Sequence, residues 1–195
     1  MAQVLRVALL SLTLCACLAP ATPTAGDDGT ADDTGSSDVN SLNPLAVGRT
    51  WTYDVTSTYA SCNSGSRDTR VTAAKMVAER PAFAVENFCG NVGYSNVDGD
   101  RVEEYYNVGH EGWMRSLDSP VSDGHTWRTS NGSTTFGLAY EDLGTYSGHP
   151  NCWRVTQDVS YTSYWIYCRA VGLVRYETID PAGGTMLVEL SRTNF

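Results

Sequence analysis

Residues 152–168 read CWRVTQDVSYTSYWIYC, and this stretch decides the fold class. A turn near Ser160 sets Trp153 opposite Tyr167 and gives the stretch two antiparallel arms. Aromatic and β-branched pairs of this kind stabilise neighbouring antiparallel strands. The same register sets the cysteines at the two ends of the stretch opposite each other, within disulfide reach. The stretch therefore predicts an antiparallel hairpin closed by a disulfide.

Residues 42–195 contain four cysteines, and an even number indicates disulfides if the chain is exported. The register above predicts Cys152–Cys168, and elimination then gives Cys62–Cys89. The alternative pairs Cys62 with Cys152 and Cys89 with Cys168. No two of these four stand two to four residues apart, as zinc ligands commonly do, so we expect no metal and no cofactor.

Alternation of apolar and polar residues extends over most of the domain, as in Trp51, Tyr53 and Val55, and it is typical of strands with one buried face. Turn-forming segments such as 98–100 and 181–184 separate these runs. Residues 68–80 would also suit a helix, but we expect a strand. The pattern predicts an all-β antiparallel fold.

An internal repeat refines this prediction. Residues 44–51 (PLAVGRTW) and 120–127 (PVSDGHTW) share Pro, Gly, Thr and Trp in register, and each copy leads into an expected strand. We therefore predict antiparallel sheet built from two related halves, about 43–118 and 119–195. The halves would join into a curved half-barrel or a sandwich.

The N-terminal residues indicate export. Residues 1–16 combine one positive charge with a short apolar run, which is the pattern of a signal peptide. They end in a lipobox-like Leu14-Cys15-Ala16-Cys17, where Cys17 would carry lipid and Cys15 is the weaker candidate. Residues 17–41 are acidic and poor in apolar residues, so we expect a disordered tether ahead of a single domain over 42–195. Leu18, which is not Asp, favours the outer membrane as the site of a lipid-anchored envelope protein.

The motifs at the two ends of the domain suggest a family. Residues 43–53 (NPLAVGRTWTY) and 171–176 (VGLVRY) resemble uncharacterised bacterial exported β-sheet lipoproteins, including TapB-like ones, which carry PLxxGxxWxY and GLVxY motifs. The resemblance covers most of residues 43–190. It implies the fold and the export, and it implies no catalytic residue. The chain departs from the family pattern at 168–170.

Charge and side-chain chemistry limit the function. Residues 42–195 carry 17 acidic and 12 basic side chains, which argues against a nucleic-acid partner. No nucleophile–base pair or cofactor loop is evident, so we predict a non-enzymatic binding or structural module. An exposed row of Trp113, Tyr105 and Tyr106 would bind a glycan or another envelope protein. The alternatives are a lipid carrier with a cavity inside a curved sheet, and a hydrolase using Glu103 and Glu104.

Overall fold

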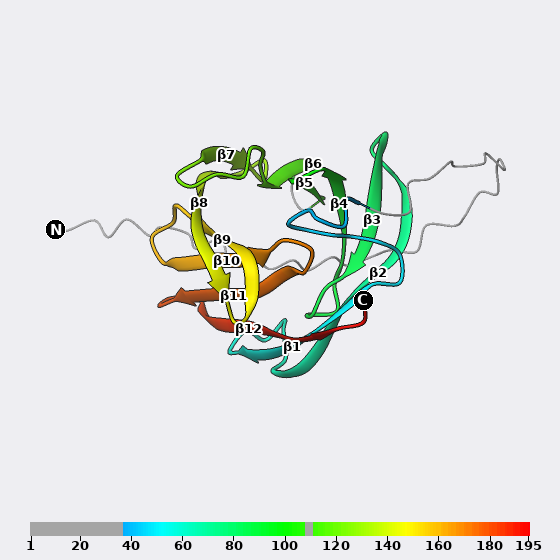
Figure 1. The fold of residues 1–195 in the computed structure, drawn as a ribbon. Coiled ribbons are helices and arrows are strands. Elements are labelled where there is room, and N and C mark those ends of the chain that lie inside the picture. The colour runs from blue at the N-terminus through cyan, green and yellow to red at the C-terminus, as the bar shows by residue number, and fades with distance from the viewer. Residues whose placement is uncertain (1–36, 108–110) are drawn as a thin grey trace.

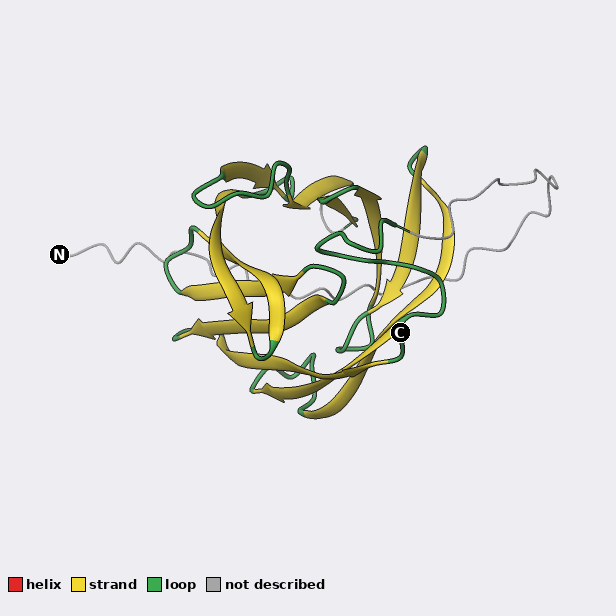
Figure 2. Ribbon diagram, in the orientation of Figure 1, coloured by secondary structure: helices red, strands yellow, loops and turns green. Residues whose placement is uncertain are grey.

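The computed structural model describes residues 37–107 and 111–195, and these form one antiparallel sheet of twelve strands with no helix (Figure 2). The expected signal peptide, Cys17 and most of the tether lie outside the described residues. The strands are β1 Thr50–Ser57, β2 Gly65–Val77, β3 Arg80–Glu86, β4 Val92–Asp98, β5 Arg101–Tyr106, β6 Gly112–Leu117, β7 Thr126–Ser130, β8 Thr135–Tyr146, β9 His149–Gln157, β10 Thr162–Cys168, β11 Gly172–Asp180 and β12 Gly184–Thr193.

The sheet consists of two meanders joined at its centre. Its strand order is β6-β5-β4-β3-β2-β1-β12-β11-β10-β9-β8-β7, so each predicted half supplies six consecutive strands. The halves meet where β1 pairs with β12. The sheet curves strongly, so its two edge strands, β6 and β7, approach each other (Figure 1). The prediction of one joined antiparallel sheet is confirmed. The alternative prediction of a sandwich is wrong, because all twelve strands belong to one continuous hydrogen-bonded sheet.

The hairpin that decided the fold class has the predicted register. Strands β9 and β10 pair Trp153 with Tyr167 and Cys152 with Cys168. The structure contains the disulfides Cys152–Cys168 and Cys62–Cys89, which are the pairs expected from this register and from elimination. Residues 68–77 are extended as well, within β2, and the two residues that follow form the turn to β3.

The internal repeat also appears in the backbone hydrogen bonds. The Gly48 N–H donates to the Val71 carbonyl, and the Val71 N–H donates to the Arg49 carbonyl. In the second half, Gly124 and His125 form the same pair of bonds with Tyr140. Both glycines have positive φ, +89° and +74°, which favours glycine at this turn. The two motifs therefore build equivalent entrances to β1 and β7.

Tight two-residue turns follow the long strands β2 and β8. Ala78 and Glu79 connect β2 to β3, and Ser147 and Gly148 connect β8 to β9, with positive φ at all four residues. Such turns match the twist of a hairpin and fix its register. The turns therefore account for the register in which β2 pairs with β3 and β8 with β9 at their outer ends.

The inner face of the sheet is filled by packed side chains. One cluster surrounds Trp51, Tyr53 and Val188, near the junction of β1 and β12. A second surrounds Trp127 and Tyr140, between β5 and β10. A third, smaller cluster lies on the outer face of the second half and includes the disulfide Cys152–Cys168. Each cluster buries the apolar residues of alternating strand positions, as the sequence pattern requires.

The N-terminal segment 37–48, which we call the strap, crosses one end of the sheet (Figure 1). Its Leu42 packs in the second cluster and Leu45 in the first, so the strap links the two parts of the core. The Leu42 N–H donates to Asp100, and Arg169 binds both oxygens of the same carboxylate at 2.9 Å. The strap is thus held between the β4–β5 and β10–β11 turns.

Candidate functional site

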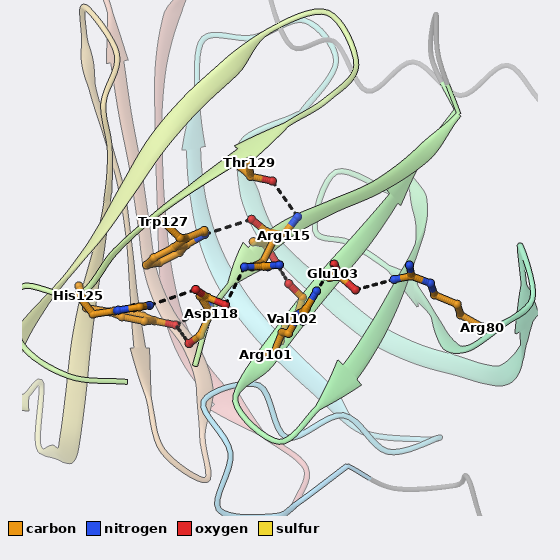
Figure 3. A network of polar contacts seen from close by, with 11 residues as sticks. Arg80, Arg101, Val102, Glu103, Arg115, Asp118, His125, Trp127 and Thr129 are labelled. Carbon is orange, nitrogen blue, oxygen red and sulfur yellow. Dashed lines mark hydrogen bonds and ion pairs between the residues drawn. The ribbon is translucent and has the colours of Figure 1, made fainter. Parts of the chain in front are cut away.

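The seam between β6 and β7 is bridged by side chains rather than by a backbone ladder. The Arg115 N–H donates to Thr129 Oγ1 at 2.9 Å, and Trp127 Nε1 donates to the Arg115 carbonyl at 3.3 Å (Figure 3). Two groups of an edge strand are thereby occupied, which protects the edge against pairing with another chain. The seam therefore has a structural role.

Asp118, just after β6, is the centre of a polar network beside the seam. Its carboxylate binds Arg115 Nη1 and His125 Nε2, each at 3.1 Å (Figure 3). Its backbone N–H donates to the Tyr140 hydroxyl, which in turn donates to the Asp118 carbonyl. Burial raises the pKa of Tyr140 above its ordinary value, so this hydroxyl stays protonated. The His125 ring stacks on Trp127 and Tyr140.

Substituting Thr129 by Val is expected to lower the free energy of unfolding by about 1 kcal/mol, because the Arg115 N–H loses its acceptor at a buried position. Urea denaturation measures the change. The control is Thr126→Val in the same strand, where the residue is exposed and the substitution should have a smaller effect. An equal loss in the two variants would contradict the bridging role of Thr129.

A hollow on the outer face of the first half is the best candidate for a binding site. It has a volume of about 510 Å³ and lies over the β2–β3 turn, β5 and β6. We call it the outer groove. Its lining consists of Ala78, Glu79, Arg80, Tyr105, Glu111, Gly112 and Trp113. A volume of this size is within the range of known small-molecule sites.

Two aromatic rings and a guanidinium group dominate the outer groove. The ring centroids of Tyr105 and Trp113, which are cross-strand partners, lie 5.3 Å apart with a tilt of 60°. The guanidinium carbon of Arg80 lies 5.5 Å from the centroid of the Trp113 ring. The Trp113 indole Nε1 is buried and has no hydrogen-bond partner among the described residues. An unpaired buried donor is unfavourable unless a ligand or water supplies an acceptor.

Carboxylates surround this aromatic centre. Glu103 accepts hydrogen bonds from Arg80 at 2.6 Å and from Arg101 at 2.8 Å (Figure 3). The pKa of Tyr105 is raised by partial burial, by the negative charge of Glu111, and by a hydrogen bond with the Glu111 carboxylate. The Tyr105 ring therefore presents a neutral phenol that is oriented by Glu111.

The structure brings together only part of the aromatic row expected from the sequence. Tyr105 and Trp113 share the outer groove, but Tyr106 does not line it. Consecutive residues of a strand point to opposite faces, so Tyr106 lies on the inner side. There its hydroxyl occupies the space that a side chain at Gly112 would fill. The prediction that Tyr106 belongs to the exposed aromatic row is therefore wrong.

Glu103 and Glu104 are also separated by the sheet. Glu103 is on the outer face with its two arginines, whereas Glu104 is on the inner face, paired across strands with Ser95 and Met114. Desolvation by burial raises the pKa of Glu104. The two carboxyl groups therefore do not face one cleft, which a hydrolytic pair would require.

Arg80, Glu79 and Glu111 complete the outer groove, and sequence reasoning missed all three. Arg80 and Glu79 come from the β2–β3 hairpin, which reaches β6 only through the curvature of strands β3 to β6. No local pattern marks them. A smaller hollow of about 240 Å³ lies where the β1–β2 and β3–β4 turns meet, beside Cys89. Neither hollow is enclosed by the inner face of the sheet.

Comparison with known proteins gives fold-level likeness alone. No family model and no curated protein matches the chain. A candidate lipoprotein from Parabacteroides distasonis is 13% identical over 81% of this chain and 100% of its own, with a TM-score of 0.42. A candidate exported protein with a YmcC-like fold from Bacteroides fragilis is 12% identical over 78% of this chain and 98% of its own, with a TM-score of 0.39. These values assign neither a family nor a function.

The described residues contain no helix that is long and apolar enough to span a membrane.

Proposed function

We propose that this protein is a lipid-anchored protein of the cell envelope. It binds carbohydrate in the outer groove, without catalysis. The observation that carries the proposal is the pairing of Trp113 and Tyr105 with Arg80 at one hollow of about 510 Å³. Flat aromatic rings cover the apolar faces of sugars, and charged planar groups bind their hydroxyls.

The packed inner face favours this surface site over a lipid carrier. Clusters of buried side chains occupy the inner side of both halves. A carrier needs an apolar cavity on the scale of several hundred Å³. Native mass spectrometry of the purified domain distinguishes the two roles, since a co-purifying apolar mass that leaves on unfolding would support the carrier.

Substituting Cys17 by Ser is expected to move the protein from the membrane fraction to the soluble fraction, because the substitution removes the acylated thiol. A thioether-linked diacylglycerol with a further acyl chain gives stable anchoring. Cell fractionation with a fatty-acid label measures the change. Cys15→Ser is the matched control and should keep both label and membrane association. The reverse outcome for the two variants would show that Cys17 is not the anchor.

Substituting Trp113 by Ala is expected to weaken carbohydrate binding at least tenfold, since a central buried aromatic contact typically contributes about 2 kcal/mol to a complex. Isothermal calorimetry with a panel of neutral, amino and acidic oligosaccharides measures the affinity. The control is Tyr94→Ala, because Tyr94 is on the same outer face but outside the groove lining. Unchanged affinity in Trp113→Ala would place the binding elsewhere.

A further inference from the structure

The charges that line the outer groove are mostly negative. Glu79 and Glu111 are exposed carboxylates of the lining, and Arg80 is the one cation among the described residues that line it. Arg80 is paired with Glu103 at 2.6 Å, and Glu103 is shared with Arg101 at 2.8 Å. Among the described residues in and beside the groove, the three carboxylates of Glu79, Glu103 and Glu111 outnumber the guanidinium groups of Arg80 and Arg101, so an approaching ligand meets a net negative charge.

The aromatic part of the groove also favours a cationic ligand. The face of an indole or phenol ring carries negative electrostatic potential and attracts cations. Arg80 shows this within the protein itself, because its guanidinium lies over the Trp113 ring. A cationic group of a ligand can bind beside it, between the rings and the carboxylates of Glu79 and Glu111.

The two carboxylates come from different connections of the sheet. Glu79 is in the two-residue turn of the β2–β3 hairpin, where both residues have positive φ. Glu111 directly precedes β6 and interacts with the Tyr105 hydroxyl. The turn before β3 and the start of β6 thus each direct one carboxylate to the groove.

We infer that the outer groove selects sugars that carry a free amino group, whose ammonium binds Glu79 and Glu111 while the ring contacts Trp113 and Tyr105. This inference rests on the proposed carbohydrate binding and names the class of sugar. Acidic glycans are disfavoured by the same carboxylates. The chain as a whole, with a net charge of −9, adds to that discrimination at low ionic strength.

The test compares three probes by isothermal calorimetry on the oxidised protein: the tetramers of glucosamine, of N-acetylglucosamine and of galacturonic acid. We expect the glucosamine tetramer to bind about three- to tenfold more tightly than the N-acetylated one, as two exposed ion pairs allow. The galacturonic acid tetramer should not bind. The double variant Glu79→Gln/Glu111→Gln should bind the glucosamine tetramer no more tightly than the N-acetylated one.

Controls separate the two proposals. Glu141→Gln removes one exposed carboxylate from the other half of the sheet, and it should leave the preference unchanged. Equal binding of amino and N-acetyl probes, binding of the acidic probe, or a preference that survives in the double variant would overturn the amino-sugar inference alone. Binding of none of the three tetramers would overturn carbohydrate binding itself. If the glucosamine tetramer bound Trp113→Ala as tightly as the unmodified protein, its binding would be non-specific charge attraction. That result would overturn both the amino-sugar inference and the carbohydrate proposal.

Discussion

Replacing Cys152 and Cys168 together by Ala is expected to lower the free energy of unfolding by about 3 kcal/mol. The bridge closes a loop with a sequence separation of 16, and constraint of the unfolded chain by such a loop accounts for most of that value. Both cysteines are fully buried in the outer-face cluster with Ile166 and Val174, so their loss also leaves a packing defect. Urea denaturation of the two proteins measures the difference.

The pair Cys152→Val/Cys168→Val separates the two contributions, because Val restores part of the volume without the covalent link. We expect it to recover only a minor part of the lost stability. The pair Cys62→Ala/Cys89→Ala is the matched control for loop closure, with a sequence separation of 27 and Cys89 only half-buried. A loss below about 1 kcal/mol for the Cys152/Cys168 pair would show that β9 and β10 hold each other without the bridge.

The hairpin could be predicted because its determinants are local. Trp153 and Tyr167 flank one turn, and only one register makes both the aromatic and the cysteine pairs. The repeated turn at Gly48 and Gly124 could be predicted for a similar reason. Each glycine is followed three residues later by a tryptophan in the sequence, and the structure gives both glycines a positive φ. Local chemistry therefore determines the strands and their halves.

The curvature of the sheet could not be predicted in this way. Bulges shift the register within several pairs, for example between Val71 and Ala73 and between Asp142 and Gly144. Such bulges bend strands and increase their twist, and the sum of these effects determines whether the edges meet. The approach of β6 to β7 therefore emerges from the whole sheet.

The candidate site shows both situations. Alternation alone assigns Tyr105 and Tyr106 to opposite faces, so the sequence already held the information that separates them. Arg80, by contrast, approaches Trp113 across two intervening strands, β4 and β5. That contact depends on strand order and curvature, which explains why the aromatic half of the groove was predicted and its charged half was not.

Substituting Glu104 by Met is expected to raise the free energy of unfolding at pH 8 by about 1–3 kcal/mol, the usual cost of burying a polar group without a partner. Glu104 is half-buried on the inner face, and the structure gives its carboxyl group no hydrogen bond or ion pair among the described residues. Met114 is its cross-strand neighbour, so an unbranched apolar side chain suits the site. Thermal and urea unfolding at several pH values measure the change.

The pH dependence has a definite sign. Burial raises the pKa of Glu104, so the folded protein binds this proton more tightly than the unfolded chain, where the pKa is about 4.3. Its contribution to stability is therefore greatest at low pH, and it falls as the pH rises through the interval between the unfolded and the folded pKa. Glu104→Gln cannot ionise, so its free energy of unfolding should not show this decrease as the pH rises. Glu103→Gln makes the same change of charge one residue away, but it breaks contacts with Arg80 and Arg101 and should lower stability instead. If Glu104→Gln kept the same slope of stability against pH as the unmodified protein, the inner carboxyl would be solvated rather than buried.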